Sequence, residues 1–152
     1  MEIRVYDAIE KVPQPAWDAL ADGEATPFLR WHWLEALETS GCATGAIGWQ
    51  PCHLTLWRGA ELMTTAPAYI KEDSDGDFSR DWGWADAAMR ARIRYYPKLV
   101  LTVPFTPRVA GVLLNVISAW EETVSVRAAV SRPTTITAFW STVKRCGAVD
   151  TR

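Results

Sequence analysis

The sequence lacks the features that mark membrane and secreted proteins. No uninterrupted apolar run approaches the roughly 18 residues that suggest a transmembrane helix. The first residues, MEIRVYDAIEKV, contain no apolar core of the kind that signal peptides carry. We therefore expect a cytoplasmic protein without an integral membrane segment.

Residues that build disulfide frameworks and metal sites are scarce. The chain has three cysteines, at positions 42, 52 and 146, and two histidines. Three is an odd number, and no C-x-x-C pair or zinc-type spacing occurs. We therefore expect free thiols in a reducing compartment and no bound metal.

Several sequence motifs of catalysis and ligand binding are absent too. Neither of the glycine-rich phosphate loops, G-x-G-x-x-G and G-x-x-x-x-G-K-[ST], is found, and there is no G-x-S-x-G nucleophile motif. The acidic stretch 73–77 departs from an EF-hand loop because Phe78 and Trp84 stand where that loop requires glycine and glutamate. A solvated turn is the simpler interpretation of this stretch.

What the sequence does contain is the composition of one globular domain rich in tryptophan. Its 152 residues are 49% hydrophobic and 22% charged, with a net charge of -2, which excludes a disordered chain and disfavours a generally basic nucleic-acid binder. Nine residues are tryptophan. An indole buries a large area but keeps one N–H to satisfy, so tryptophan favours cores and half-wet clefts.

Charge is divided unevenly along the chain. Residues 1–76 carry five Lys/Arg and twelve Asp/Glu, whereas residues 77–152 carry eleven and six, which gives net charges of -7 and +5. A basic half could contact an anionic ligand or a membrane surface. The simpler interpretation is that the two halves face one another within the fold.

Hydrophobic periodicity and turn residues predict a mixed order of elements in the first half. Alternating apolar residues predict a strand around Ile3–Val5, followed by a short helix through Trp17 that ends near residue 23. A second helix is predicted to begin at Thr26 as N-cap and Pro27 as first residue, and to end at Gly41. Residues 41–51 are predicted to form a loop.

The following segments predict a hairpin, a helix and a strand. Strand 53–57 and a return strand 62–70 are joined by a turn at 58–61, and Pro67 should disrupt the return strand because proline donates no ladder hydrogen bond. A polar loop at 71–80 then leads to a helix over 82–93 with Asp81 as its cap, and to a doubly covered strand over 98–105. Residues 112–130 fit either one long helix or a strand and a helix, and residues 138–146 fit a last short helix. The order predicts an α/β domain of the α+β kind.

Two local patterns hold the candidate chemistry. In the stretch Asp81–Asp86, Trp82 and Trp84 lie between two carboxylates, and an aromatic wall beside carboxylates suits a sugar or an amine. The alternative is that both indoles pack on the hairpin while Asp81 caps a helix. The second pattern is a basic run, Arg90 to Lys98, interleaved with Tyr95 and Tyr96, which suits a phosphate group or forms a solvated helix face.

Several segments taken together resemble one protein family. They are Pro15–Leu20, Pro27–Leu29, Leu34–Gly41, Thr44 with Gly48–Pro51 and with His53 and Leu54, Asp81–Ala87, Tyr95–Leu99 and Val103–Pro107. Their order and wording resemble the FemAB-like group of the GNAT acyltransferase superfamily, bacterial proteins of peptidoglycan biosynthesis or recognition. The resemblance covers about residues 12–107. It divides the chain into a FemAB-like, GNAT-type N-terminal region, 1–107, and a divergent tail, 108–152, of the kind expected in a truncated or frame-disrupted member.

The resemblance implies a fold, a reaction and its partners. The fold would be a GNAT-like mixed sheet with flanking helices, left incomplete here, and an incomplete sheet with an open edge favours a homodimer. The reaction would be acyl or aminoacyl transfer to an amine of a small molecule or a peptidoglycan precursor. The donor would be acyl-CoA or aminoacyl-tRNA, with tRNA as a partner and no permanently bound cofactor. The glycine-rich acyl-CoA loop of ordinary GNAT enzymes is absent.

Amine acylation also suggests roles for individual residues. Asp81, Asp86 or His53 would help to remove a proton from the amine, and Tyr96 would serve the leaving group. Substrate binding is expected from Lys71, Trp82, Trp84, Tyr95 and Lys98. We expect weak or no activity from the chain alone. The alternative is a non-catalytic module that binds a glycan or peptide in a tryptophan-lined cleft, or a fragment without function.

Overall fold

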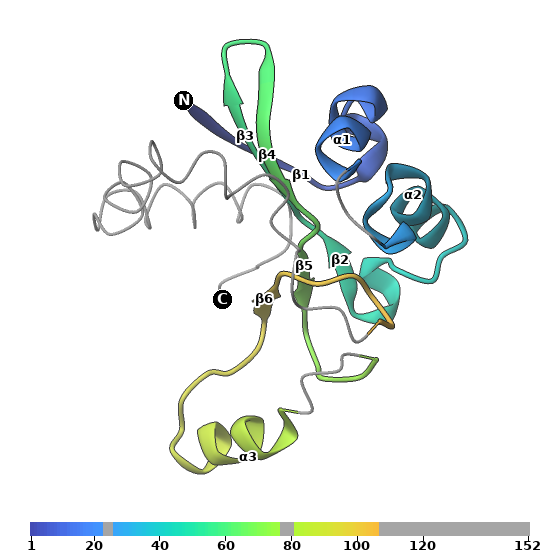
Figure 1. Ribbon diagram of the computed structural model, residues 1–152. Coiled ribbons are helices and arrows are strands. Elements are labelled where there is room, and N and C mark those ends of the chain that lie inside the picture. The colour runs from blue at the N-terminus through green and yellow to red at the C-terminus, as the bar shows by residue number, and fades with distance from the viewer. Residues whose placement is uncertain (23–25, 77–80, 107–152) are drawn as a thin grey trace.

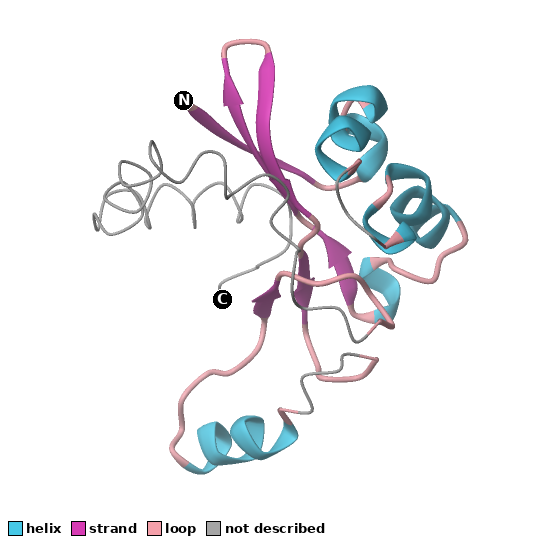
Figure 2. Cartoon of the chain, viewed as in Figure 1, coloured by secondary structure: helices cyan, strands magenta, loops and turns pink. Residues whose placement is uncertain are grey.

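The computed structural model describes residues 1–22, 26–76 and 81–106, which fold into helices and two antiparallel sheets (Figure 1; Figure 2). One sheet has the order β1-β3-β4 and the other β2-β5-β6. The strands are β1 (Glu2–Tyr6), β2 (Trp49–Pro51), β3 (His53–Arg58), β4 (Glu61–Ala66), β5 (Tyr69–Lys71) and β6 (Lys98–Val100). The helices are α1 (Gln14–Ala21), α2 (Trp31–Thr39) and α3 (Trp82–Arg90). This architecture confirms the predicted mixed α/β class.

Pro67 separates the two sheets. The return strand of the hairpin pairs with β3 as far as Ala66, and the chain then enters the second sheet at Tyr69. Proline cannot donate to a strand ladder, so the continuous pairing ends beside it. The predicted disruption of this strand is therefore confirmed. As a result, the segment predicted as one return strand contributes β4 to the first sheet and β5 to the second.

The second helix begins later than the sequence predicted. Residues Pro27–Leu29 form a 3-10 turn, and the side chain of Thr26 accepts a hydrogen bond from the Phe28 amide at 3.3 Å. Arg30 then takes an extended conformation, so α2 starts only at Trp31. Asp18 of α1 accepts the amide hydrogen of Trp31 at 3.0 Å and thereby caps α2 from another helix.

The main core lies where α1 and α2 cover the β1-β3-β4 sheet. Trp17 is fully buried there, and its indole N–H donates to the Leu29 carbonyl at 2.8 Å. The same cluster contains Ile9, Val12, Ala21, Leu29, Leu34, Trp57, Leu62 and Val103. Burial of aliphatic and aromatic surface from both helices and the sheet is what stabilises this half of the described structure.

Two predicted elements differ from those observed. Residues 41–51 contain a 3-10 turn, Gly45–Ile47, and strand β2 instead of a continuous loop. The long strand predicted over 98–105 is only the half-buried β6, which ends at Val100. Three-residue strands show no periodicity, and apolarity alone does not fix where a ladder ends. The elements predicted at 112–130 and 138–146 lie outside the described residues.

Candidate functional site

Two lysines face each other at the same end of the second sheet. Lys71 of β5 and Lys98 of β6 are direct partners in the antiparallel register. Like charges at opposed positions repel, so such a pair needs carboxylates nearby. Each lysine has one: Lys71 pairs with Asp73, and Lys98 pairs with Asp81.

Lys71, the last residue of β5, stabilises the loop that follows this strand. Its side chain is fully buried, and its ammonium donates to the Asp73 carboxylate at 2.9 Å and to the carbonyl of Asp75 at 2.6 Å. The same ammonium lies 4.2 Å from the centre of the Trp49 ring, a favourable cation–π geometry. A buried ammonium with these partners holds the loop in place, so the geometry gives no support to the predicted role of Lys71 in substrate binding.

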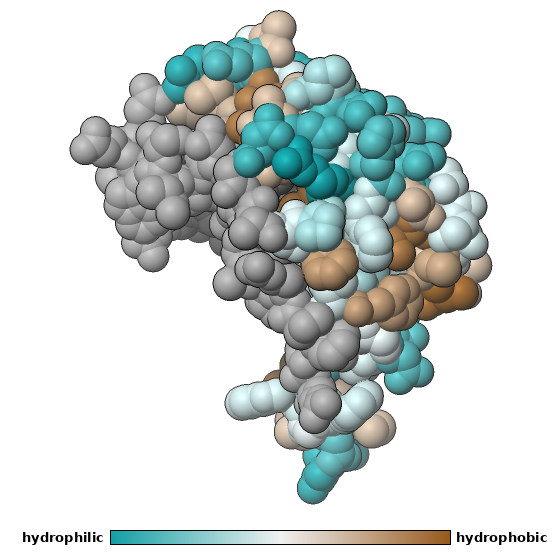
Figure 3. All heavy atoms as spheres, turned by 45° about the vertical axis from the view of Figure 1, so that its right-hand side comes forward, coloured by the Kyte–Doolittle hydropathy of each residue, from teal (hydrophilic) through white to brown (hydrophobic). Residues whose placement is uncertain are grey.

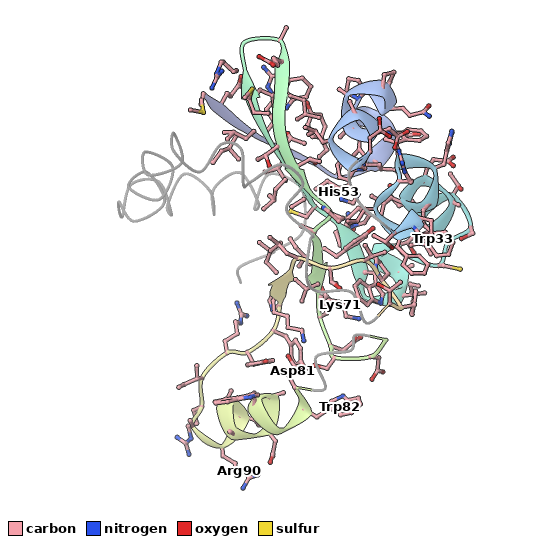
Figure 4. The ribbon with its side chains drawn as sticks, in the orientation of Figure 1. Trp33, His53, Lys71, Asp81, Trp82 and Arg90 are labelled. Atoms are coloured by element: carbon pink, nitrogen blue, oxygen red, sulfur yellow. The ribbon has the colours of Figure 1, made fainter. Side chains whose placement is uncertain are left out.

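Five side chains, from the loop after β5, the start of α3 and the chain around β6, form one hydrogen-bonded group, here called the Asp81 cluster. One oxygen of Asp81 accepts from the Ser74 hydroxyl, while the other accepts from Tyr95 at 2.6 Å and from Lys98 at 2.5 Å. Ser74 in turn contacts the Tyr96 hydroxyl at 2.5 Å and accepts from Lys98 at 3.2 Å. Because Ser74 donates to Asp81, Tyr96 is the donor in their contact. Figure 4 places Asp81 between β5 and α3.

The cluster stabilises Asp81 in its charged form. Burial on its own would raise the pKa of this carboxyl, but the hydrogen bonds from Lys98, Ser74 and Tyr95 outweigh burial and hold its pKa well below the usual range. The hydrogen bond to Asp81 also raises the pKa of Tyr95. The result is a partly exposed ion pair between Asp81 and Lys98, with the Tyr95 hydroxyl hydrogen-bonded to its carboxylate.

The position of Asp81 explains why it does not cap α3. It occupies the N-cap position, but its side chain makes no capping hydrogen bond, because both carboxylate oxygens are used in the Asp81 cluster. The predicted capping role is therefore wrong. Asp81 uses its carboxylate to bind Ser74, Tyr95 and Lys98, and not the free backbone N–H groups of α3.

The other candidates on α3 lie outside the cluster. Asp86 forms an ion pair with Arg90, one turn further along the helix. Trp82 and Trp84 are 56% and 74% exposed, so the interpretation in which both indoles pack on the hairpin is wrong. Residues two apart on a helix do not face each other, so these two indoles do not form one wall.

A second polar group surrounds His53, and the sequence did not predict it. His53 is fully buried, and its Nδ1 accepts the Ala68 amide hydrogen at 3.4 Å, so Nε2 carries the proton and donates to Glu38 at 2.7 Å. The other Glu38 oxygen accepts the Ile9 amide hydrogen at 2.9 Å. Close by, burial and the charge of Glu38 raise the pKa of Tyr69, whose hydroxyl has no hydrogen-bond partner among the described residues.

The described ranges contain no group of three or more His, Cys, Asp or Glu side chains placed to hold a metal ion. They also contain no helix that is long and apolar enough to cross a membrane. The Asp81 cluster itself offers hydroxyl, carboxylate and ammonium groups.

Comparison with known families decides what kind of protein this is. The family model FemAB-like, described as peptidoglycan biosynthesis/recognition, matches residues 8–142. The chain belongs to the FemAB-like family. The FemAB-like match includes the whole Asp81 cluster. It also continues beyond residue 107, the last residue of the segments that carry the resemblance described above. No curated protein and no solved structure matches the chain.

The lowered pKa of Asp81 predicts an acid-sensitive contribution to stability in this FemAB-like protein. A carboxyl whose pKa falls on folding stabilises the native state fully at any pH above its ordinary pKa of 3.8. This stabilisation is lost as the pH falls below 3.8 and through the lower pKa of the folded state. Asp81→Asn should therefore lower the free energy of unfolding by about 2 kcal/mol at pH 7, and by less near pH 3. Urea unfolding at both pH values measures this, and a difference that stays constant with pH would contradict the assignment.

Proposed function

We propose that the Asp81 cluster is the reaction site of an N-acyltransferase that acylates an amine of a peptidoglycan precursor. The observation that carries this proposal is the convergence of one ammonium and two hydroxyls on a single part-buried carboxylate, with a third hydroxyl, that of Tyr96, bound to Ser74 beside them. Membership of a peptidoglycan biosynthesis/recognition family supports the choice of acceptor. The acyl donor would be acyl-CoA or aminoacyl-tRNA.

The proposed reaction places two demands on the site. The acceptor nitrogen attacks the acyl carbonyl, a C–N bond forms, and negative charge develops on the carbonyl oxygen before the C–S or C–O bond of the donor breaks. Fixed positive charge beside that oxygen lowers the barrier. The Lys98 ammonium would supply this charge, and the Tyr96 hydroxyl would protonate the departing thiolate or alkoxide. The attacking nitrogen loses one proton as the amide forms, and this proton would pass through solvent to restore the Tyr96 hydroxyl.

Asp81 suits a positioning role better than that of a base. Its pKa is lowered by the donors around it, so it is a weak proton acceptor at neutral pH. It would hold Lys98 and Tyr95 in place instead. Asp86 is paired with Arg90 outside the cluster and is given no role in the reaction. The amine would then react in its neutral form, so transfer should accelerate as the pH approaches the pKa of the acceptor.

A second candidate function is recognition of a precursor without chemistry. The observation that favours it is the saturation of Asp81, whose two oxygens accept from Ser74, Tyr95 and Lys98. A cluster with its carboxylate fully engaged can orient a bound peptide or sugar without removing a proton from it. Binding that occurs without transfer would separate the two functions.

Replacement of Lys98 tests the proposed site. Lys98→Met should lower transfer of an acyl group to a peptidoglycan-precursor amine at least tenfold, because loss of one charge-stabilising donor costs about 10²–10³ in rate. The transfer is measured with labelled acyl-CoA and with aminoacyl-tRNA. Lys11→Met is the matched control, since Lys11 pairs with Asp7 at 2.6 Å on a separate 3-10 turn.

The outcomes distinguish the candidates. Normal transfer by Lys11→Met with strongly reduced transfer by Lys98→Met supports the acyltransferase. Precursor binding measured by calorimetry, without transfer, and weakened by Lys98→Met supports recognition. Binding and transfer that are both indifferent to Lys98→Met would remove the Asp81 cluster from either function.

A further inference from the structure

Helix α3 presents large apolar side chains that no described element covers. None of its residues is buried. Trp82, Trp84 and Met89 are 56%, 74% and 71% exposed, and Ile93, just beyond the helix, is 65% exposed. Figure 1 shows α3 set apart from both sheets and joined to them by loops. Exposed apolar groups gathered in this way mark an interaction surface.

The apolar residues of α3 lie on one side of the helix. At 100° per residue, Trp84, Ala88, Ala85, Met89 and Trp82 follow one another across an arc of about 160°. The two indoles are at the edges of this arc, with smaller side chains between them. On the same scale Asp86 and Arg90, which pair with each other, lie about 40° and 80° beyond Trp82, outside this arc. The helix is therefore amphipathic although nothing described packs on it.

The end of α3 is closed by its own backbone. Arg92 takes a left-handed conformation with φ 57°, its amide donates to the Met89 carbonyl at 3.1 Å, and the Ile93 amide donates to the Ala88 carbonyl at 2.8 Å. This is a Schellman motif, which satisfies the last carbonyls and turns the following residue back onto the helix. Ile93 thus extends the apolar face beside Ala88.

Charge around this face is positive. Arg90, Arg92 and Arg94 are exposed at the C-terminal end of α3. The two acidic residues of the described stretch 81–106 are already paired, Asp86 with Arg90 and Asp81 with Lys98. Among the described residues, no carboxylate pairs with Arg92 or Arg94. Figure 3 shows hydrophilic spheres at the lowest tip of the molecule, next to paler ones of the same lobe.

From these observations we propose that α3 docks the protein on an anionic membrane surface. Nine residues are too short to span a bilayer but long enough to lie in its interface. Trp82 and Trp84 would enter the headgroup region, where indoles are favoured, and Arg92 and Arg94 would contact lipid phosphates. The inference does not depend on acyl transfer, because it concerns a different surface from the Asp81 cluster.

Flotation with lipid vesicles tests the proposal. The full chain should bind vesicles of phosphatidylglycerol and phosphatidylcholine, and bind vesicles of phosphatidylcholine alone at least tenfold more weakly. Trp82→Ser combined with Trp84→Ser should weaken binding to the anionic vesicles at least tenfold. Arg92→Gln and Arg94→Gln should each cost roughly fivefold, and the loss should shrink at high salt.

Trp33→Ser is the matched control for the tryptophan variants. Trp33 is also an exposed indole, at 39%, but it belongs to α2 and lies far from α3 in Figure 4. It should leave vesicle binding unchanged, and circular dichroism checks that each variant is folded. The proposal is overturned if the full chain does not bind anionic vesicles or if the α3 variants bind as well as the unchanged chain. Self-association that the α3 variants abolish, without vesicle binding, would instead assign the face to a second copy of the chain.

Discussion

Glu38→Ala should lower the free energy of unfolding by about 3–5 kcal/mol. The Glu38 carboxylate, 11% exposed, accepts from the buried imidazole of His53 at 2.7 Å and from the Ile9 amide at 2.9 Å. Alanine leaves both donors buried without partners, and each unsatisfied donor costs about 1–3 kcal/mol. The substitution also removes the side chain that joins α2 to both the 3-10 turn Ile9–Lys11 and β3.

Glu38→Gln distinguishes the contribution of the hydrogen bonds to stability from that of side-chain packing, because glutamine has nearly the same size and shape as glutamate. Glutamine has one acceptor oxygen and one donor group, so it can satisfy one of the two donors and must oppose the other. We expect it to lose about half as much stability as Glu38→Ala. Urea unfolding, with the midpoint and slope determined separately, measures both variants. If Glu38→Ala shifted the midpoint no more than an ordinary surface substitution, the bridging role of Glu38 would be refuted.

Trp17→Ala should lower the free energy of unfolding by a similar amount, about 3–5 kcal/mol, because it opens a large cavity in the main core. Trp17 is fully buried, packs edge-on against His53 with ring centres 6.0 Å apart, and donates to the Leu29 carbonyl at 2.8 Å. The cavity would lie between α1, the 3-10 turn Pro27–Leu29 and the sheet.

Trp17→Phe keeps most of this volume and loses the indole donor. It should cost about 1–2 kcal/mol, mainly from the unpaired Leu29 carbonyl. Thermal unfolding followed by circular dichroism compares the two variants. Equal losses from phenylalanine and alanine would show that the hydrogen bond, and not the packing, is the larger contribution of Trp17.

Local chemistry made most elements of the described fold predictable. The alternation in β1 and β3, the cap at Thr26 and the interruption at Pro67 all act through neighbouring residues of the chain. Strand β2 was missed because its three residues form a strand only through pairing with β5, which follows much later. The relation to a GNAT fold stays a prediction.

Most residues of the Asp81 cluster were predicted from the sequence, but the hydrogen bonds that join them were not. Asp81 was singled out beside Trp82 and Trp84, whereas Tyr95, Tyr96 and Lys98 were singled out in the basic run that follows. Ser74 was missed, since a serine in a polar loop carries no signal until the loop returns it to Asp81. Glu38 was missed for a related reason: helical periodicity places it on the polar side of α2, and only the packing of α2 brings it to His53.

The opposed register of Lys71 and Lys98 has a mechanical consequence. Segment 72–97, which includes α3, leaves the sheet and re-enters it at adjacent positions, so it forms an arm whose two ends are tied together. Such an arm can be exchanged for a short turn without changing the order of any strand. The Asp81 cluster sits at the neck of the arm, so a force applied to α3 reaches these five side chains before it reaches the core.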